Sequence, residues 1–199
     1  MSLTDNLTLS QIKKISGEVI LPGSKSLSNR ILLLSMLAEG QTEIQNLLDS
    51  DDIRRMVEAL ETLGIEFEEN RAENRISVSG TAGIIPVSEA TLMLGNAGTA
   101  IRPLTAAMTL GHGRFVLDGV ARMRERPIID LVKGLTQLGA NLHCLNGTDC
   151  PPVEVIADGL PGGKTRLSGA ISSQYLTAIL LVAPYAKKDV EIEITDKLV

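Results

Sequence analysis

A segment with one recurring pattern occurs three times in this chain of 199 residues, and it constrains the fold more than any other feature. The copies begin at Ser24, Asn96 and Ile171, and each passes from small polar residues into a stretch rich in Ala and Leu. Arg30, Arg102 and Gln174 occupy equivalent positions in the three copies, and the interval from each to the next is the same. Such a period predicts a fold built from one repeated supersecondary unit.

The residues that follow each copy define a longer unit. After the first copy, stretches of alternating apolar and polar residues predict strands at 42–47, 65–69 and 75–79. Between the first two of these strands, the amphipathic stretch 52–63 predicts a helix. The second copy is followed by the same order of elements, over 114–118, 127–138 (the helix), 141–145 and 153–157. Gly64 and Gly139 stand where glycines often end helices, and Pro127 suits a first helical turn. The unit is therefore strand–helix–strand–helix–strand–strand.

The repeat predicts an α/β fold in which these units pack around buried, parallel helices. The helices are expected over residues 25–38, 99–110 and 173–183, which are nearly apolar all round. After the third helix the chain provides one more strand, at 189–195, before it reaches Val199. By its own period the third unit lacks a helix and two strands, which predicts a fragment or one half of a split protein. A complete chain with a degenerate third copy is the alternative.

Composition narrows the classes of function. The net charge is −5, only 2% of the residues are aromatic and Trp is absent, which argues against a nucleic-acid-binding protein. No apolar stretch reaches the length of a membrane span, and the N-terminus does not resemble a secretion signal. Cys144 and Cys150 predict reduced thiols in a cytoplasmic protein. With His143 and Asp149 they fit no common zinc spacing, so we expect no metal site.

Small polar and cationic residues gather at four junctions between loops and helices, namely 22–30, 95–103, 122–127 and 172–174. Backbone N–H groups at a helix N-terminus bind anions, and Arg suits bidentate contact with phosphate or carboxylate. Since the rest of the chain is acidic, the pattern favours a small polyanionic ligand. Helix capping and solvated cations are the alternative interpretation. The acidic group Asp49, Asp51 and Asp52 is interpreted as capping of the helix that begins at Asp52.

Five motifs along the chain resemble the 5-enolpyruvylshikimate-3-phosphate (EPSP) synthase family, namely LPGSKSLSNR, LLDSDDIR, LGNAGTAIRPLTAA, RMRERPI and SSQYLTA. The resemblance extends from Leu9 to Val199 and implies the enolpyruvyl transferase fold, with two globules of three units each. It implies transfer of the enolpyruvyl group of phosphoenolpyruvate to the 5-hydroxyl of shikimate-3-phosphate, giving EPSP and phosphate, and inhibition by glyphosate. Residues 1–20 would be a strand segment that belongs with the second globule, and residues 21–199 the N-terminal globule with an incomplete third unit.

The resemblance also implies roles for single residues. Those at the phosphoenolpyruvate site would be Lys25, Asn96, Gly98, Arg126 and Gln174, of which Lys25, Arg126 and Gln174 are catalytic. Those at the shikimate-3-phosphate site would be Ser26, Arg30, Ser172, Ser173 and Gln174. Arg30 would bind the shikimate carboxylate, and the two serines the 3-phosphate. Thr99 and Pro103 would hold the helix of Gly98, and these three residues would set inhibitor sensitivity. The resemblance implies no metal and no organic cofactor.

The chain departs from the family pattern in its length. The general base and further cations of the family would lie in the missing C-terminal half, so we expect that half as a partner and expect this chain alone to be inactive. One rival family is the UDP-N-acetylglucosamine enolpyruvyl transferase, which has a loop cysteine in the region of residues 112–126, where this chain has none. The rival of another class is a non-catalytic module that only binds phosphate or another anion.

Overall fold

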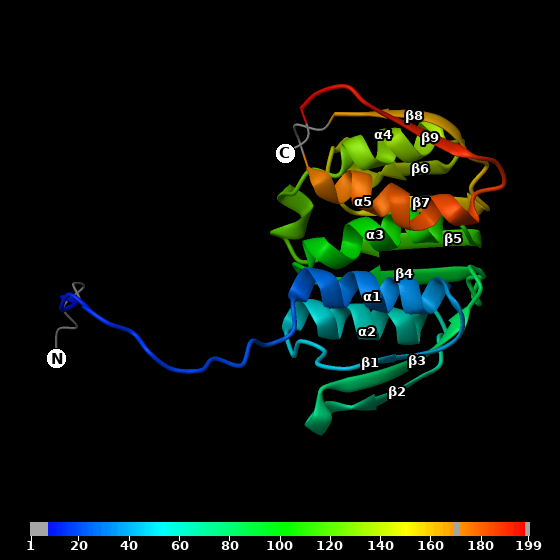
Figure 1. Ribbon diagram of the computed structural model, residues 1–199. Helices are drawn as coiled ribbons and strands as arrows, with labels where there is room; N and C mark the ends of the chain where they lie inside the picture. Colours follow the sequence, from blue (N-terminus) through cyan, green and yellow to red (C-terminus); the bar gives the residue numbers. More distant parts are fainter. Residues whose placement is uncertain (1–7, 169–171, 198–199) are drawn as a thin grey trace.

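The computed structural model describes residues 8–168 and 172–197 as three sheets with helices packed against them (Figure 1). The first unit has the helices α1 (Lys25–Leu37) and α2 (Asp51–Thr62). Its strands form an antiparallel sheet in the order β1–β3–β2, with β1 (Glu39–Ile44), β3 (Arg75–Thr81) and β2 (Phe67–Asn70). The strand predicted at 42–47 begins earlier, at Glu39, because Ala38 already ends α1 in an extended conformation.

The second unit repeats this arrangement with one more strand. Its helices are α3 (Gly98–Met108) and α4 (Ile129–Gln137). Its sheet has the order β4–β5–β7–β6, with β4 (Glu89–Met93), β5 (His112–Asp118), β7 (Val153–Asp158) and β6 (Asn141–Cys144). The prediction that α4 starts at Pro127 is wrong. The Ile128 and Ile129 N–H groups both donate to the Asp149 carbonyl, at 2.9 and 3.2 Å, so the chain becomes helical only at Ile129.

The third unit, within the described residues, consists of β8 (Gly163–Leu167), α5 (Ser173–Val182) and β9 (Val190–Ile194). β8 runs parallel to β9, as β4 runs parallel to β5, so α3 and α5 are both crossover helices between parallel strands. β4 and β8 are strands that the repeated unit requires but that the sequence analysis did not locate. Gly64 and Gly139 follow α2 and α4 with φ of +74° and +88°, the left-handed conformation expected after a helix.

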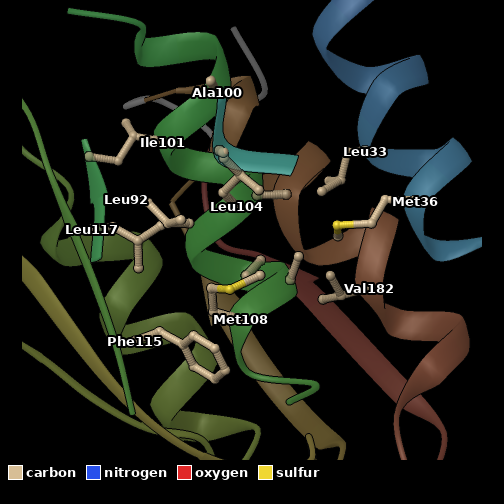
Figure 2. Packing of buried hydrophobic residues seen from close by; sticks show 14 of the residues in the cluster. Leu33, Met36, Leu92, Ala100, Ile101, Leu104, Met108, Phe115, Leu117 and Val182 are labelled. Carbon is tan, nitrogen blue, oxygen red and sulfur yellow. The ribbon is translucent and has the colours of Figure 1, made fainter. Parts of the chain in front are cut away.

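The three helices of the repeated segment lie side by side, with α3 between α1 and α5 (Figure 1). Figure 2 shows α3 packed between the sheet, which contributes Leu92, Phe115 and Leu117, and the helices on its other side, which contribute Leu33, Met36 and Val182. The prediction that all three helices are apolar because they are buried all round holds only for α3. Leu34 on α1 and Leu180 on α5 are about half exposed, because each of these helices has one side open.

The edge of β1 distinguishes the first unit from the other two. β5 pairs with β4 and β9 pairs with β8, but in the described part of the chain β1 pairs only with β3. The segment before α1, residues 8–24, forms no helix or strand and extends away from the body (Figure 1). It exposes six large apolar side chains, namely Leu9, Ile12, Ile15, Val19, Ile20 and Leu21. No described helix is long and apolar enough to cross a membrane.

Candidate active site

The N-terminal ends of α1, α3 and α5 point in one direction, and this common end gathers the residues singled out in the sequence (Figure 1). A small depression between the three helices is lined by residues from all three copies, namely Ser26, Arg30, Thr99, Pro103, Gln174 and Thr177. The loop that carries Arg126 reaches the same end from the second unit, where it contacts Asn96. The constant period of the repeat therefore brings three segments that are distant in sequence to one site, and the Arg126 loop adds a fourth.

Lys25 is held at the first turn of α1 by a neighbouring helix. Its Nζ lies 3.4 Å from Asp52 Oδ2 at the start of α2. Asp52 also accepts from the Thr99 hydroxyl at 3.3 Å, and Thr99 in turn accepts from Asn29 Nδ2 at 2.7 Å. The interpretation of the acidic group Asp49, Asp51 and Asp52 as the cap of α2 is wrong, because Ser50 occupies the cap position and Asp51 and Asp52 lie in the first turn of the helix. The carboxylate of Asp52 instead joins α1, α2 and α3.

Arg126 lies directly against the start of α3. Its Nη1 donates to the Asn96 carbonyl at 3.0 Å and to Asn96 Oδ1 at 3.3 Å. Gly98 has no side chain in the way, since a Cβ there would lie only 2.4 Å from Arg126 Nη2. The glycine is therefore what allows the guanidinium to approach the helix N-terminus, where backbone N–H groups already favour anions.

The other two arginines of the RMRERP stretch have structural partners. Arg124 donates two hydrogen bonds to Asp118, at 3.0 and 2.5 Å, and Arg122 pairs with Glu125. Burial raises the pKa of the Asp118 carboxyl, but the Arg124 bonds and the Gly119 N–H outweigh burial and leave the pKa lowered. Of the three arginines in this stretch, only Arg126 contacts the start of α3.

Gln174 and Ser172 mark the start of α5. Ser172 caps the helix, because its hydroxyl accepts from the Gln174 N–H at 3.3 Å, and Ser173 is exposed beside it. The Gln174 side chain accepts a 2.5 Å hydrogen bond from Arg102 Nη1. The contact between Arg102 and Gln174 was not predicted, although their separation by one full period was the signal that could have placed the two side by side.

The arginines of the site differ from the other arginines of the chain in whether they pair with a carboxylate. Eight of the eleven arginines form ion pairs with carboxylates, namely Arg54, Arg55, Arg71, Arg75, Arg114, Arg122, Arg124 and Arg166. Within residues 8–168 and 172–197, the three without an ion pair are Arg30, Arg102 and Arg126. Burial lowers the pKa of Arg102, and the nearby charge of Arg126 acts in the same direction. Guanidinium groups that lack carboxylate partners form a positive site for an anion.

The cysteines and the other side chains that could bind a metal ion do not form a cluster in the described part of the chain. Among the described residues, no three His, Cys, Asp or Glu side chains gather as a metal site would require. Cys144 and Cys150 are free thiols, the first at the end of β6 and the second in the loop between β6 and β7. Burial, followed by the charges of Cys150 and Asp149, raises the pKa of Cys144 to about 11.

The fold and the site together define a repeated α/β protein with arginines that lack carboxylate partners at the N-termini of parallel helices. The model of the EPSP synthase (3-phosphoshikimate 1-carboxyvinyltransferase) family matches residues 9–199, and the chain belongs to this family. It is 61% identical over 201 residues to the chloroplastic 3-phosphoshikimate 1-carboxyvinyltransferase of Petunia hybrida, with 97% of this chain and 39% of the relative covered. It is 53% identical over 196 residues to the enzyme of that name from Shewanella pealeana, with 98% and 46% covered.

A solved structure of EPSP synthase from Acinetobacter baumannii shares the fold. Its TM-score with this chain is 0.80 at 25% sequence identity, and the match covers 91% of this chain and 41% of that one. The chain therefore spans less than half the length of the relatives it matches. The enolpyruvyl transferase fold implied by the resemblance is confirmed. The relatives of 61% and 53% identity are named as 3-phosphoshikimate 1-carboxyvinyltransferases, which favours this family over the UDP-N-acetylglucosamine enolpyruvyl transferase.

Proposed function

We propose that this chain is the N-terminal part of an enzyme that transfers the enolpyruvyl group of phosphoenolpyruvate to the 5-hydroxyl of shikimate-3-phosphate. The observation that carries the proposal is the set of three arginines without carboxylate partners, Arg30, Arg102 and Arg126, at one end of three parallel helices. Both substrates are polyanions, so their phosphate and carboxylate groups would supply the missing negative charge. The proposed products are EPSP and phosphate.

In this proposal, phosphoenolpyruvate lies at the start of α3. Arg126, already in contact with Asn96, binds one of its anionic groups, and Gly98 leaves room beside the helix N-terminus. Lys25 projects from the first turn of α1 and supplies a second cation, whose position Asp52 fixes. Addition followed by loss of phosphate passes through a tetrahedral intermediate, whose charge these fixed donors stabilise.

Shikimate-3-phosphate would occupy the neighbouring part of the site. Ser26 and Arg30 line the depression from α1, which supports the proposal that Arg30 binds the carboxylate. Ser172 and Ser173 start α5 and would bind the 3-phosphate, while Gln174 lies between the two substrates. Proton transfer from the acceptor hydroxyl requires a general base, which we assign to the C-terminal half of the enzyme.

Two exposed features of the first unit support the proposal that a second globule is the partner of this chain. The apolar side chains of residues 8–24 are exposed, and β1 has an unpaired edge in the described chain. We assign residues 1–20 to a segment that docks on the second globule as a strand and residues 21–199 to the N-terminal globule; of these, residues 1–7, 169–171 and 198–199 lie outside the described part of the chain. We also propose a cytoplasmic location, supported by the free thiols of Cys144 and Cys150. The Petunia relative is named as chloroplastic.

The test compares this chain alone with the chain joined to the C-terminal half of the Petunia relative, which is called the complete synthase below. Phosphate release from phosphoenolpyruvate is followed with and without shikimate-3-phosphate. We expect product only from the complete synthase, and we expect Arg126→Ala to lower its turnover while Arg122→Ala does not. Turnover by the chain alone would contradict the assignment of the base to the other half. Binding of shikimate-3-phosphate without turnover by the complete synthase would favour an anion-binding module.

A further inference from the structure

Arg102 occupies the middle of a row of equivalent positions. The row runs across the three parallel helices, with Arg30 on α1, Arg102 on α3 and Gln174 on α5, each one period of the repeat from the next. The two outer members line the depression at the site, whereas Arg102 comes from the central, buried helix. Its guanidinium is directed to the neutral Gln174 rather than to a carboxylate.

The contact between Arg102 and Gln174 fixes the orientation of the Gln174 amide. A guanidinium can only donate hydrogen bonds, so the group that faces Arg102 Nη1 at 2.5 Å must be the amide oxygen. The amide NH2 group then points away from Arg102 and remains a donor. A Gln side chain without this bond would rotate and present its oxygen to an anion as readily as its NH2 group.

Tyr175 connects this pair to the loop of Arg126. The Arg102 guanidinium lies over the Tyr175 ring, 5.4 Å from its centroid, and the ring is buried. The Tyr175 hydroxyl donates to the Pro127 carbonyl at 2.6 Å, and Pro127 directly follows Arg126. Arg102 therefore contacts Gln174 and Tyr175 directly, and Tyr175 connects it to the loop that carries Arg126.

We propose that Arg102 is a positioning residue, which orients the Gln174 amide so that its NH2 group donates to the bound substrates. This inference rests on the proposed function, because it concerns the substrate contact of Gln174. Arg102 itself does not touch substrate in this arrangement. Its charge raises the positive potential of the site, and its hydrogen bond directs the neighbouring donor.

The test is a double-mutant cycle in the complete synthase, with Arg102→Met, Gln174→Ala and the two combined. Methionine keeps an unbranched apolar stem and removes the guanidinium. The Michaelis constant for shikimate-3-phosphate should rise about tenfold in each single variant, which is the usual effect of one lost hydrogen bond to a charged group. The combined variant should differ from either single variant by less than about twofold, because both changes remove one contact.

Two controls separate positioning from a merely structural role. Arg54→Met removes an exposed arginine whose partner is Asp49, and it should leave the Michaelis constants unchanged. Arg102→Lys keeps the charge but loses the flat fork over Tyr175, so its Michaelis constant should stay well above that of the native enzyme. Thermal unfolding of each variant measures the effect on stability separately.

Several results would overturn the inference. If the effects of Arg102→Met and Gln174→Ala multiply in the combined variant, Arg102 acts independently of Gln174. If Arg102→Lys restores the native Michaelis constant, charge alone is enough and orientation is not involved. If the native complete synthase shows no turnover, the proposed function fails, and this inference fails with it. If the native complete synthase turns over normally but the effects in the double-mutant cycle are additive, only the positioning role of Arg102 is refuted.

Discussion

Replacement of Gly98 by Ala should separate glyphosate inhibition from phosphoenolpyruvate use in the complete synthase. A Cβ at this position would lie 2.4 Å from Arg126 Nη2 and 2.7 Å from Arg126 Cζ. The guanidinium must retreat by about 1 Å before the methyl group and the nitrogen are in ordinary van der Waals contact. Since the obstacle is the far end of a flexible side chain, α3 keeps its place and the change is concentrated on Arg126.

The retreat of Arg126 affects the two ligands to different degrees. It breaks the 3.0 Å contact with the Asn96 carbonyl and weakens one charge-assisted contact with phosphoenolpyruvate, which should raise the Michaelis constant about tenfold. Glyphosate is the longer ligand, so it also meets the new methyl group. Overpacking of this kind costs about 1–3 kcal/mol in addition. We therefore expect the inhibition constant of glyphosate to rise on the order of a hundredfold or more.

Steady-state kinetics with phosphoenolpyruvate varied at several glyphosate concentrations gives both constants in one experiment. The matched control is Gly111→Ala, whose methyl group would meet the Phe115 ring at 2.9 Å in the core, away from the site. That variant should unfold at a lower temperature and leave the ratio of the two constants unchanged. The reasoning is refuted if Gly98→Ala changes both constants in parallel or leaves glyphosate inhibition as it was.

Two further predictions concern a cation of the site and the two thiols. Arg126→Ala should raise the Michaelis constant for phosphoenolpyruvate about tenfold to a hundredfold, and that for shikimate-3-phosphate less; equal losses for the two substrates would mean that Arg126 mainly supports the fold. Burial raises the pKa of both thiols, that of Cys144 to about 11, so iodoacetamide at pH 8 should modify Cys150 before Cys144. Mass spectrometry of the folded chain measures this order, and modification of Cys144 first would contradict it.

The repeat predicted most of the fold because it is a local property of the sequence. The helices at 25–38, 99–110 and 173–183 agree with α1, α3 and α5 to within two residues at each end, since small polar residues precede each helix and an apolar stretch fills it. The start of α4 was predicted wrongly because contacts from Asp149 set it, and Asp149 lies beyond the far end of that helix in sequence. Nothing in the sequence around Pro127 indicates a contact with Asp149.

The sequence proposed members for the candidate site but could not predict the contacts among them. The motifs placed Lys25 and Arg126 near one another through the family resemblance, but the partners that fix them come from other segments. Asp52 pairs with Lys25 across two helices, and Thr99 bonds Asp52 from the second unit. The acidic cluster was interpreted as helix capping because caps are local, whereas an ion pair between helices depends on how they pack.

The unpaired edge of β1 has a consequence for how this chain behaves at high concentration. A strand edge offers a row of free N–H and C=O groups to any extended segment, and the chain carries such a segment in residues 17–21, with Val19, Ile20 and Leu21 exposed. The segment of one molecule can therefore add to the β1 edge of another. Because this addition is bimolecular, dilution reverses it, and sedimentation of the chain should depend on concentration until a covering strand is supplied.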